Sequence, residues 1–248
     1  MEPAGIFFLV ILGVVAFLYA SVGHGGASGY LGLMGLFGVA TVYMRPSALM
    51  LNLFVAGLSF YHFYRGGHFR FKLFLPFALA SIPMAFLGAN INLDPTWYKR
   101  LLALCLVFAT LRMTGFLGKN RDQSFDDYKG IKWLPALITG GLIGLFSGMI
   151  GIGGGIILSP VILLLGWGNV KETAAVSALF ILVNSTSGLI GLVSHGAEFA
   201  PKLFMWVGVA AFGGFLGSYQ ASLKFKPVFV KNLLAMVLVM ASIKLLFI

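Results

Sequence analysis

Two glycine-rich segments, residues 23–26 (Gly-His-Gly-Gly) and 151–155 (Gly-Ile-Gly-Gly-Gly), constrain the fold more than any other feature of this chain. Each directly follows a long uncharged apolar run, at residues 4–22 and 133–150. A helix interrupted inside a bilayer exposes backbone groups that lipid cannot satisfy, so such breaks persist only where protein, water or a ligand satisfies them. Paired breaks at corresponding positions in two halves of a chain point to a transporter's binding site. The sequence therefore predicts a membrane protein that moves a small solute.

The composition is that of a membrane protein. Hydrophobic residues make up 59% of the 248 and charged residues 10%, whereas soluble domains carry about 25% charged residues. Long continuous apolar runs, rather than short alternating segments, predict helices and not a β-barrel. We expect an all-α integral membrane protein whose first run is a retained helix and not a signal peptide. The single Cys105 lies in an apolar run, so we expect no disulfide, no metal site and no cofactor.

Ten apolar segments fall into two sets of five. They predict one transmembrane domain over residues 1–248, with a first repeat at 4–117, a linker at 118–132 and a second repeat at 133–248. The expected segments are Ala4–Val22, Ala27–Tyr43, Pro46–Tyr64, Leu73–Ala89 and Leu101–Leu117, then Trp133–Ile150, Ile156–Trp167, Thr173–Val193, Leu203–Tyr219 and Val228–Ile248. Because Ile156–Trp167 is short, the segments next to the glycines are either full spans or re-entrant hairpins, which gives roughly eight to ten helices.

The two halves share landmarks besides the glycines. Ser-Ala-Leu occurs at 47–49 and again at 177–179, and Asn52 and Asn184 fall at similar depth in their segments. The offset drifts only from 128 residues (23 to 151) to 132 (52 to 184). Because five segments per half is an odd number, the halves are expected to have opposite orientations, as in the inverted repeats of alternating-access transporters.

The basic residues predict an orientation in the cytoplasmic membrane. With the linker inside the cell, only five of the 17 cations lie outside, and the amino terminus is external, as the positive-inside rule requires. Those five are Arg45, Lys99, Arg100, Lys202 and Lys244. The net charge of +10 comes from such short loops, so we expect no nucleic-acid partner. The apolar helices permit a homodimer, but the sequence does not specify one.

The breaks are the predicted binding site for a small anion. A helix that starts at a glycine break presents unpaired amides and a positive dipole end. Close packing is the alternative role of such glycines, and their duplication favours a site. The predicted substrate-binding residues are Gly23, His24, Gly25, Gly26, Ser28, Asn52, Gly151, Gly153, Gly154, Gly155, Asn184 and Ser185. No catalytic residue is predicted.

Individual polar residues have alternative roles. His24 either binds the anion, carries a proton, or is a neutral packing histidine bonded to a carbonyl that the break exposes. Asn52 and Asn184 either donate to an oxyanion or join helices. Arg45 and Lys171 precede corresponding segments, and snorkelling to the interface is favoured over attraction of the anion. No carboxylate lies inside a segment except at the edge, at Glu172, so a carboxylate relay for protons or sodium is poorly supported.

The second glycine run resembles a family signature. Residues 147–155 (Ser-Gly-Met-Ile-Gly-Ile-Gly-Gly-Gly), with Pro160, are similar to the glycine motif of the TauE/SafE family of putative sulfite exporters, and residues 22–28 resemble a degenerate first copy. The resemblance implies a carrier for sulfite, a sulfonate or another small organosulfur anion, working in export. His24 and Ala27 stand where the second copy has Ile152 and Gly155, so the two sides of the site differ chemically.

Two other functions remain open. Residues 26–29 (Gly-Ala-Ser-Gly) match the pattern of rhomboid intramembrane serine proteases, with Ser28 as nucleophile and His62 as the only helical partner. This hypothesis gives no reason for the second break. A passive anion channel uses the same helix ends, and sequence does not separate it from a carrier. Because paired breaks in two opposed halves are typical of alternating-access transporters, the function that we predict is a carrier.

Overall fold

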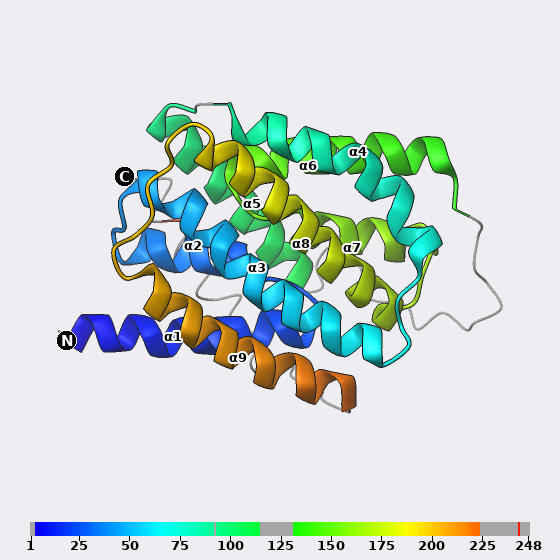
Figure 1. Ribbon diagram of the computed structural model, residues 1–248, viewed down its shortest axis with the longest axis horizontal. Coiled ribbons are helices and arrows are strands. Elements are labelled where there is room, and N and C mark those ends of the chain that lie inside the picture. Colours follow the sequence, from blue (N-terminus) through cyan, green and yellow to red (C-terminus); the bar gives the residue numbers. More distant parts are fainter. Residues whose placement is uncertain (1–2, 92, 115–130, 224–242, 244–248) are drawn as a thin grey trace.

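The computed structural model describes residues 3–91, 93–114, 131–223 and 243, and this part of the chain contains nine α-helices and no strand (Figure 1). The predicted all-α class is confirmed. In chain order the helices are α1 Pro3–Ser21, α2 Ala27–Leu36, α3 Thr41–Arg65, α4 Phe71–Ala89, α5 Pro95–Thr114, α6 Trp133–Ile150, α7 Gly155–Leu164, α8 Val170–Val193 and α9 Leu203–Leu223. Most of the predicted linker and, apart from Ile243, the predicted segment Val228–Ile248 lie outside the described residues.

Five of the described helices are long and apolar enough to cross a membrane. They are α3, α4, α6, α8 and residues Leu203–Ala221 of α9, and α1 carries a slightly shorter apolar stretch, Gly5–Ser21. By contrast α2 and α7 have 10 residues each, which is about 15 Å of helix against a hydrocarbon layer of about 30 Å. These two helices are therefore half-length helices that follow the two breaks.

The expected range Ala27–Tyr43 was wrong at its far end, because α2 stops at Leu36. Gly38 adopts φ 71°, and the Val39 amide donates to the Met34 carbonyl at 2.9 Å, which is a helix-ending bond pattern. The other half-helix ends in the same way, with φ 66° at Gly166 and a 3.0 Å bond from the Trp167 amide to Ile162. The expected Ile156–Trp167 is therefore Gly155–Leu164, and the two endings are again 128 residues apart.

Close helix pairs form wherever glycines remove side chains from the contact. Helices α4 and α6 lie together along the upper edge of the bundle, and α1 and α9 along the lower edge (Figure 1). The first pair matches Gly140 with Phe77, Gly144 with Ser81 and Gly148 with Ala85, and the second matches Gly213 with Gly13 and Gly217 with Phe17. Because residue numbers rise together along both helices, each pair is parallel.

The remaining contacts fix the other directions. Helix α8 runs antiparallel to α3, since Leu49 meets Gly188 whereas Asn52 meets Ser185. It runs parallel to α4, where Ser81 bonds to Asn184 and Ile82 to Ser187. Helix α3 runs parallel to α9, through Val55 with Gly214 and His62 with Ser218. Helices α1, α3 and α9 therefore point one way, and α4, α6 and α8 point the other way. Inverted repeats require these directions, and the descent of the halves from one repeat stays a prediction.

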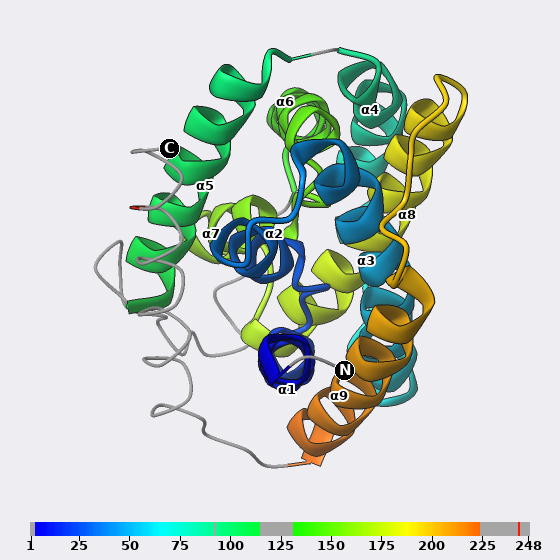
Figure 2. The same ribbon diagram turned by 90° about the vertical axis from the view of Figure 1, so that its left-hand side faces the viewer.

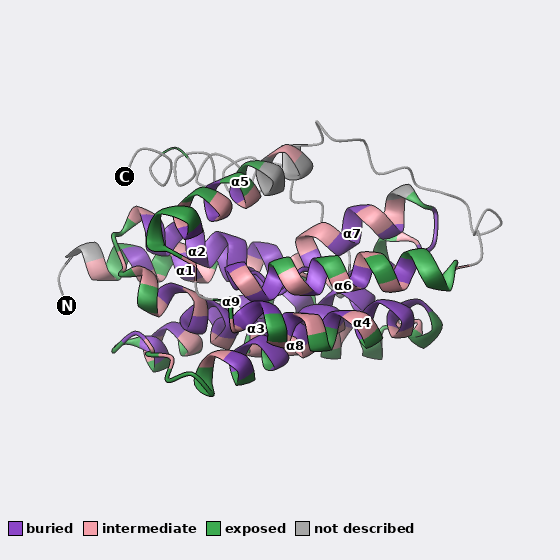
Figure 3. Ribbon diagram, turned by 90° about the horizontal axis from the view of Figure 1, so that it is seen from above, coloured by how far each residue is buried: buried purple, intermediate pink, exposed green. Residues whose placement is uncertain are grey.

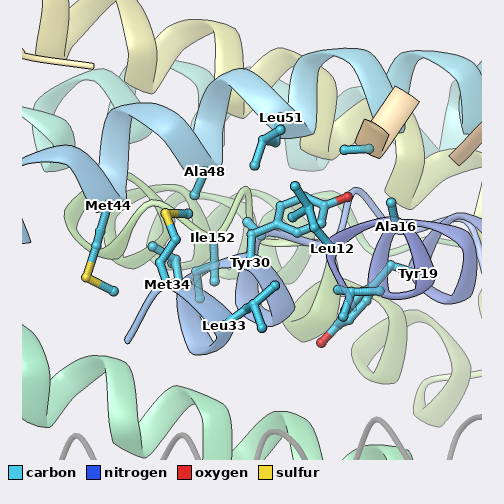
Figure 4. Packing of buried hydrophobic residues seen from close by; sticks show 14 of the residues in the cluster. Leu12, Ala16, Tyr19, Tyr30, Leu33, Met34, Met44, Ala48, Leu51 and Ile152 are labelled. Carbon is cyan, nitrogen blue, oxygen red and sulfur yellow. The ribbon is translucent and has the colours of Figure 1, made fainter. Parts of the chain in front are cut away.

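The polarity of the fold is that of a membrane protein. Buried residues face the middle of the bundle and exposed residues lie on its outer faces (Figure 3). Large apolar side chains are among the most exposed, such as Phe204 at 89% and Leu104 at 69%. In water such faces would cause association, whereas lipid solvates them. Inside, α1, α2 and α3 share one core, which includes Tyr30 of α2 and Ile152 of the second break (Figure 4).

Candidate functional site

Both predicted breaks are present in the structure. Helix α1 ends at Ser21 and α2 begins at Ala27, while α6 ends at Ile150 and α7 begins at Gly155. Five of the glycines between them have the left-handed backbone that side chains disfavour, with φ between 74° and 98°. They are Gly23, Gly26, Gly151, Gly153 and Gly154. Glycine is therefore required here because the chain must reverse its direction within four or five residues.

The side chain of Asn52 joins the two breaks. Its Oδ1 accepts a hydrogen bond of 3.0 Å from the Ala27 amide, the first residue of α2. Its Nδ2 donates to the Ile152 carbonyl in the second break, at 3.5 Å, and to Ser185 Oγ on α8, at 3.2 Å. Asn52 is fully buried and lies near the middle of α3. The two breaks, which belong to different halves of the chain, thus meet on one amide.

Two glycines make room for this amide. A Cβ atom on Gly25 would overlap Asn52 Oδ1, and one on Gly153 would lie 2.7 Å from Asn52 Nδ2. Both would also lie 2.9 Å from Ile181 on α8, and a Cβ on Gly155 would overlap the same side chain. The side chains of Asn52 and Ile181 therefore lie between the two breaks, and only glycine leaves room for them there.

The start of each half-helix carries amide groups without acceptors. Asn52 satisfies the Ala27 amide, whereas the amides of Gly25, Gly26 and Ser28 have no acceptor within the part of the chain that the structure describes. In the second break, the amides of Gly153, Gly154, Gly155 and Ile156 likewise have no acceptor among the described residues. Helices α2 and α7 lie in the middle of the bundle, with α5 on one side and α3 and α8 on the other (Figure 2). Amides and positive helix ends gathered at this depth favour an anion.

His24 connects the first break to the second half of the chain. Its Nδ1 lies 2.9 Å from the Val22 carbonyl and its Nε2 lies 3.0 Å from Ser159 Oγ on α7. Ser159 also lies 2.8 Å from Ser177 Oγ on α8 and 3.0 Å from the Gly155 carbonyl. Because the carbonyl accepts only, Nδ1 carries a hydrogen, and Nε2 either accepts from Ser159 or, if protonated, donates to it. His24 is thus hydrogen-bonded at both ring nitrogens.

The two asparagines have different environments. Asn184 is buried on α8, and its Oδ1 accepts a 2.9 Å hydrogen bond from Ser81 on α4. Its Nδ2 has no hydrogen-bond partner among the described residues. Its neighbour Ser185 faces Asn52 instead. Asn52 and Asn184 therefore fall at similar depth in the sequence but have different places in the fold. Asn52 lies between the breaks, whereas Asn184 lies between α8 and α4.

The other predicted glycines line packing contacts of the breaks. A side chain on Gly23 would meet Ala174, one on Gly26 would meet Tyr30, and one on Gly151 would meet Arg45. Gly154 lies against Phe180 and Ile143. The Tyr30 hydroxyl is fully buried beside Gly26 and has no partner among the described residues. It is one polar group of the site that sequence reasoning missed.

Ser28 and His62 do not form the dyad that a serine protease requires. Ser28 Oγ is 2.8 Å from the Tyr19 hydroxyl on α1. His62 Nδ1 is 2.8 Å from Ser218 Oγ on α9, and Ser218 donates to the Gly214 carbonyl. The two residues therefore have separate partners, on α1 and on α9.

Arg45 corrects the expectation of a snorkelling side chain. Its Nη2 donates to the Ala89 carbonyl at 2.9 Å and to the Gly148 carbonyl at 3.0 Å. These carbonyls belong to the last turns of α4 and α6, whose negative dipole ends attract a cation. Lys171 is exposed. The sequence signal for Arg45 was ambiguous because depth along a helix does not tell which face a residue occupies.

Ser159 and Ile181 are further residues that sequence reasoning did not predict for the site. Ser159 lies one turn after Gly155, on the same face of α7, so the i, i+4 spacing was an available signal. Ile181 carried no signal, since apolar residues fill α8. Among the described helices Glu172 is the only carboxylate, and the described residues contain no cluster of His, Cys, Asp and Glu suited to a metal. The break region therefore contains hydrogen-bond donors and no negative side chain.

Comparison with known proteins agrees with this architecture. The family model described as sulfite exporter TauE/SafE matches residues 7–245. The protein described as "Probable membrane transporter protein y4hK" from Sinorhizobium fredii is 33% identical over 246 residues, which cover 99% of this chain and 100% of that protein. No solved structure matches the chain.

Proposed function

The chain belongs to the sulfite exporter TauE/SafE family of membrane transporters, and we propose that it is a carrier that binds one small anion between its two glycine breaks. The observation that carries the proposal is the meeting of both breaks on Asn52, in the middle of α3. A site formed equally by two halves of a bundle opens to one side when the halves tilt one way and to the other side when they tilt back.

The site suits an anion on electrostatic grounds. Each half-helix start contributes roughly half a positive charge, and amides and hydroxyls bind an oxyanion without the desolvation cost of a buried cation. Asn52 Oδ1 now accepts from the Ala27 amide. An oxyanion oxygen would accept from that amide and its unpaired neighbours instead, which releases Asn52 from the first break. The anion thereby weakens the link between the breaks, and this is the step that couples binding to the change of access.

The family and the membrane potential support a proposal for the substrate class and the direction of transport. Sulfite or a sulfonate is the cargo that we propose, because a small sulfur oxyanion offers several acceptor oxygens to the two amide clusters. We propose export through a cytoplasmic membrane with the amino terminus outside. A monovalent anion that leaves a cell with a negative interior gains about 2.3 kcal/mol per 100 mV, so export needs no coupling ion.

Anion binding is tested by the melting temperature of the purified full chain. Sulfite, methanesulfonate, thiosulfate, sulfate, phosphate and acetate form the panel, since a ligand that binds only the folded state stabilises it by about 2.7 kcal/mol at 100 times its Kd. We expect a concentration-dependent rise with sulfite or a sulfonate and none with acetate. A flat response to every anion would contradict the proposal.

Transport is tested in liposomes that contain the purified protein. A carrier gives saturable uptake and is accelerated by the same anion on the opposite side, whereas a passive channel gives linear flux without counter-transport. We expect saturation and counter-transport. Linear flux would instead support the channel.

A further inference from the structure

A cavity lined partly by polar side chains lies at the end of the bundle where α3 begins and α4 and α8 end. Its volume is about 270 Å³. Four separate segments line it, through Arg45 on α3, Asn90 after α4, Tyr98 on α5 and His195 after α8. The distribution of basic residues predicts that this end faces the outside of the cell.

Arg45 carries a positive charge that no carboxylate balances in this cavity. Its two hydrogen bonds go to carbonyl groups, those of Ala89 and Gly148, which orient the guanidinium and leave its net charge in place. Its Nε is buried and has no partner in the described parts of the chain, where the one ion pair joins Arg70 to Glu172. Asp94 and Glu198 adjoin the lining residues Pro95 and Ala197 in the sequence, but neither carboxylate lines the cavity.

The cavity is large enough for a hydrated ion. One water occupies roughly 30 Å³ in the liquid, so the cavity holds a small oxyanion together with some of its water.

Arg45 links this cavity to the break site. Gly151, in the second break, packs on the Cα, Cβ and Cγ atoms of Arg45. Arg45 also lies seven residues before Asn52 on α3, which is about 10 Å along a helix. An anion on Arg45 is therefore within one short step of the breaks.

We propose that this cavity is a second anion-binding site, a vestibule in which Arg45 holds the same class of small oxyanion that the breaks carry. This inference rests on the proposed function for the identity of the anion. The Arg45 guanidinium attracts the anion, His195 and Asn90 line the cavity around it, and the carbonyls of Ala89 and Gly148 keep the guanidinium in position. The vestibule concentrates the anion at the outer end of the path.

The experiment measures sulfite and methanesulfonate binding to the purified full chain by calorimetry, in the wild type, Arg45→Gln, Arg45→Lys, Asn52→Ala and the Arg45→Gln/Asn52→Ala double variant. Arg100→Gln is the matched control, because Arg100 is an exposed cation on α5 that stacks on Trp97 and does not line the cavity. The melting temperature of each variant without anion is recorded as well, since loss of the bonds to two helix ends destabilises the fold whatever Arg45 binds.

We expect Arg45→Gln to weaken binding about tenfold or more, because hydrogen bonds to charged groups are the strong ones. Arg45→Lys should bind better than Arg45→Gln, and Arg100→Gln should bind like the wild type. Asn52→Ala should keep a binding event that the double variant loses.

Equal binding by Arg45→Gln and Arg100→Gln would overturn the vestibule. If Asn52→Ala in that case abolished both binding and flux, the carrier proposal would stand without the vestibule. Binding that depends on Arg45 in a wild-type protein without flux would keep the vestibule and overturn the carrier. A wild type that binds neither probe would overturn both.

Discussion

At the scale of single residues, Asn52 is a side chain that hydrogen-bonds to both breaks. Its carbonyl oxygen and its amino group bond to opposite halves of the chain, and Ser185 fixes the amino group from α8. An amide is suited to this place because it both accepts and donates while remaining neutral. A carboxylate would accept only, and its negative charge would repel the proposed cargo.

We predict that Asn52→Ala lowers the free energy of unfolding by about 1–3 kcal/mol, because it leaves the buried Ala27 amide and Ile152 carbonyl unpaired. Anion flux in liposomes should fall about tenfold or more. Asn52→Asp should retain the bond from Ala27 and yet lose anion binding at the breaks. Thermal melts and flux assays measure both effects.

Thr186→Val is the control for Asn52, since Thr186 is an exposed residue of α8 that bonds only to the Leu182 carbonyl of its own helix. Its change in stability should stay within about 0.5 kcal/mol. If Asn52→Ala behaved like Thr186→Val, the breaks would not depend on this amide.

A second prediction separates close packing from backbone conformation at the glycines. Gly153→Ala combines a left-handed φ of 74° with a clash against Asn52, whereas Gly196→Ala has the same conformation, φ 75°, in open space. We expect Gly196→Ala to cost about 1–2 kcal/mol and to leave transport intact. Gly153→Ala should cost more and should abolish anion flux. Equal effects of the two variants on stability and flux would mean that only the backbone matters.

At the scale of helices, glycine has two distinct roles. In the breaks it permits left-handed turns, while on α6 and α9 it lets one helix backbone touch another. Gly144, for example, lies against the Ser81 carbonyl of α4, in the middle of a row of three glycines on α6. Such small-residue contacts are how membrane helices gain packing energy without a hydrophobic driving force.

We predict that Gly144→Ala separates α4 from α6 and destabilises the protein by about 1–3 kcal/mol, because the new methyl group overlaps backbone atoms that cannot move alone. Gly141→Ala is the matched control, since its methyl group would meet Ala80 at an ordinary 3.6 Å. Thermal melts in detergent compare the two. Similar melting temperatures for Gly144→Ala and Gly141→Ala would show that α4 and α6 are not packed as closely as in the structure.

At the scale of the whole molecule, helices from different halves pair with one another. Helix α1 packs on α9 and α6 packs on α4, so each half supplies one member of each parallel pair. The half-helices end in the same left-handed glycine turn, 128 residues apart, at Gly38 and Gly166. Both features fit two halves that are related by a twofold axis in the membrane plane, as our transport proposal needs.

The orientation prediction is tested with cysteines at the two ends of the bundle, in a Cys105→Ala background. Glu198→Cys lies in the exposed turn after α8, and Lys72→Cys lies at the exposed start of α4. In intact cells an impermeant maleimide should label position 198 and reach position 72 only after permeabilisation. The reverse pattern would invert the assigned topology and place the Arg45 cavity inside the cell.

Most of the helical fold and the positions of the two breaks could be predicted from sequence, because both depend on one-dimensional patterns. Helix α6 has the predicted bounds, and both breaks lie where the glycines are. The length of α2 was overestimated, since an apolar run does not reveal that Gly38 turns left-handed. The roles of Asn52 and Asn184 were not separable, because equal depth in two helices does not tell which neighbour each side chain faces.

The sequence alone determined the solvent, the helical class and the two places where the helices must stop, since apolar length and glycine content act locally along the chain. Only the tertiary structure decided that the breaks share Asn52, that Asn184 bonds to Ser81 and that Arg45 turns inward onto two helix ends. Those contacts join residues from 25 to 103 positions apart. They depend on which helix faces meet, which is set by the packing of the whole bundle.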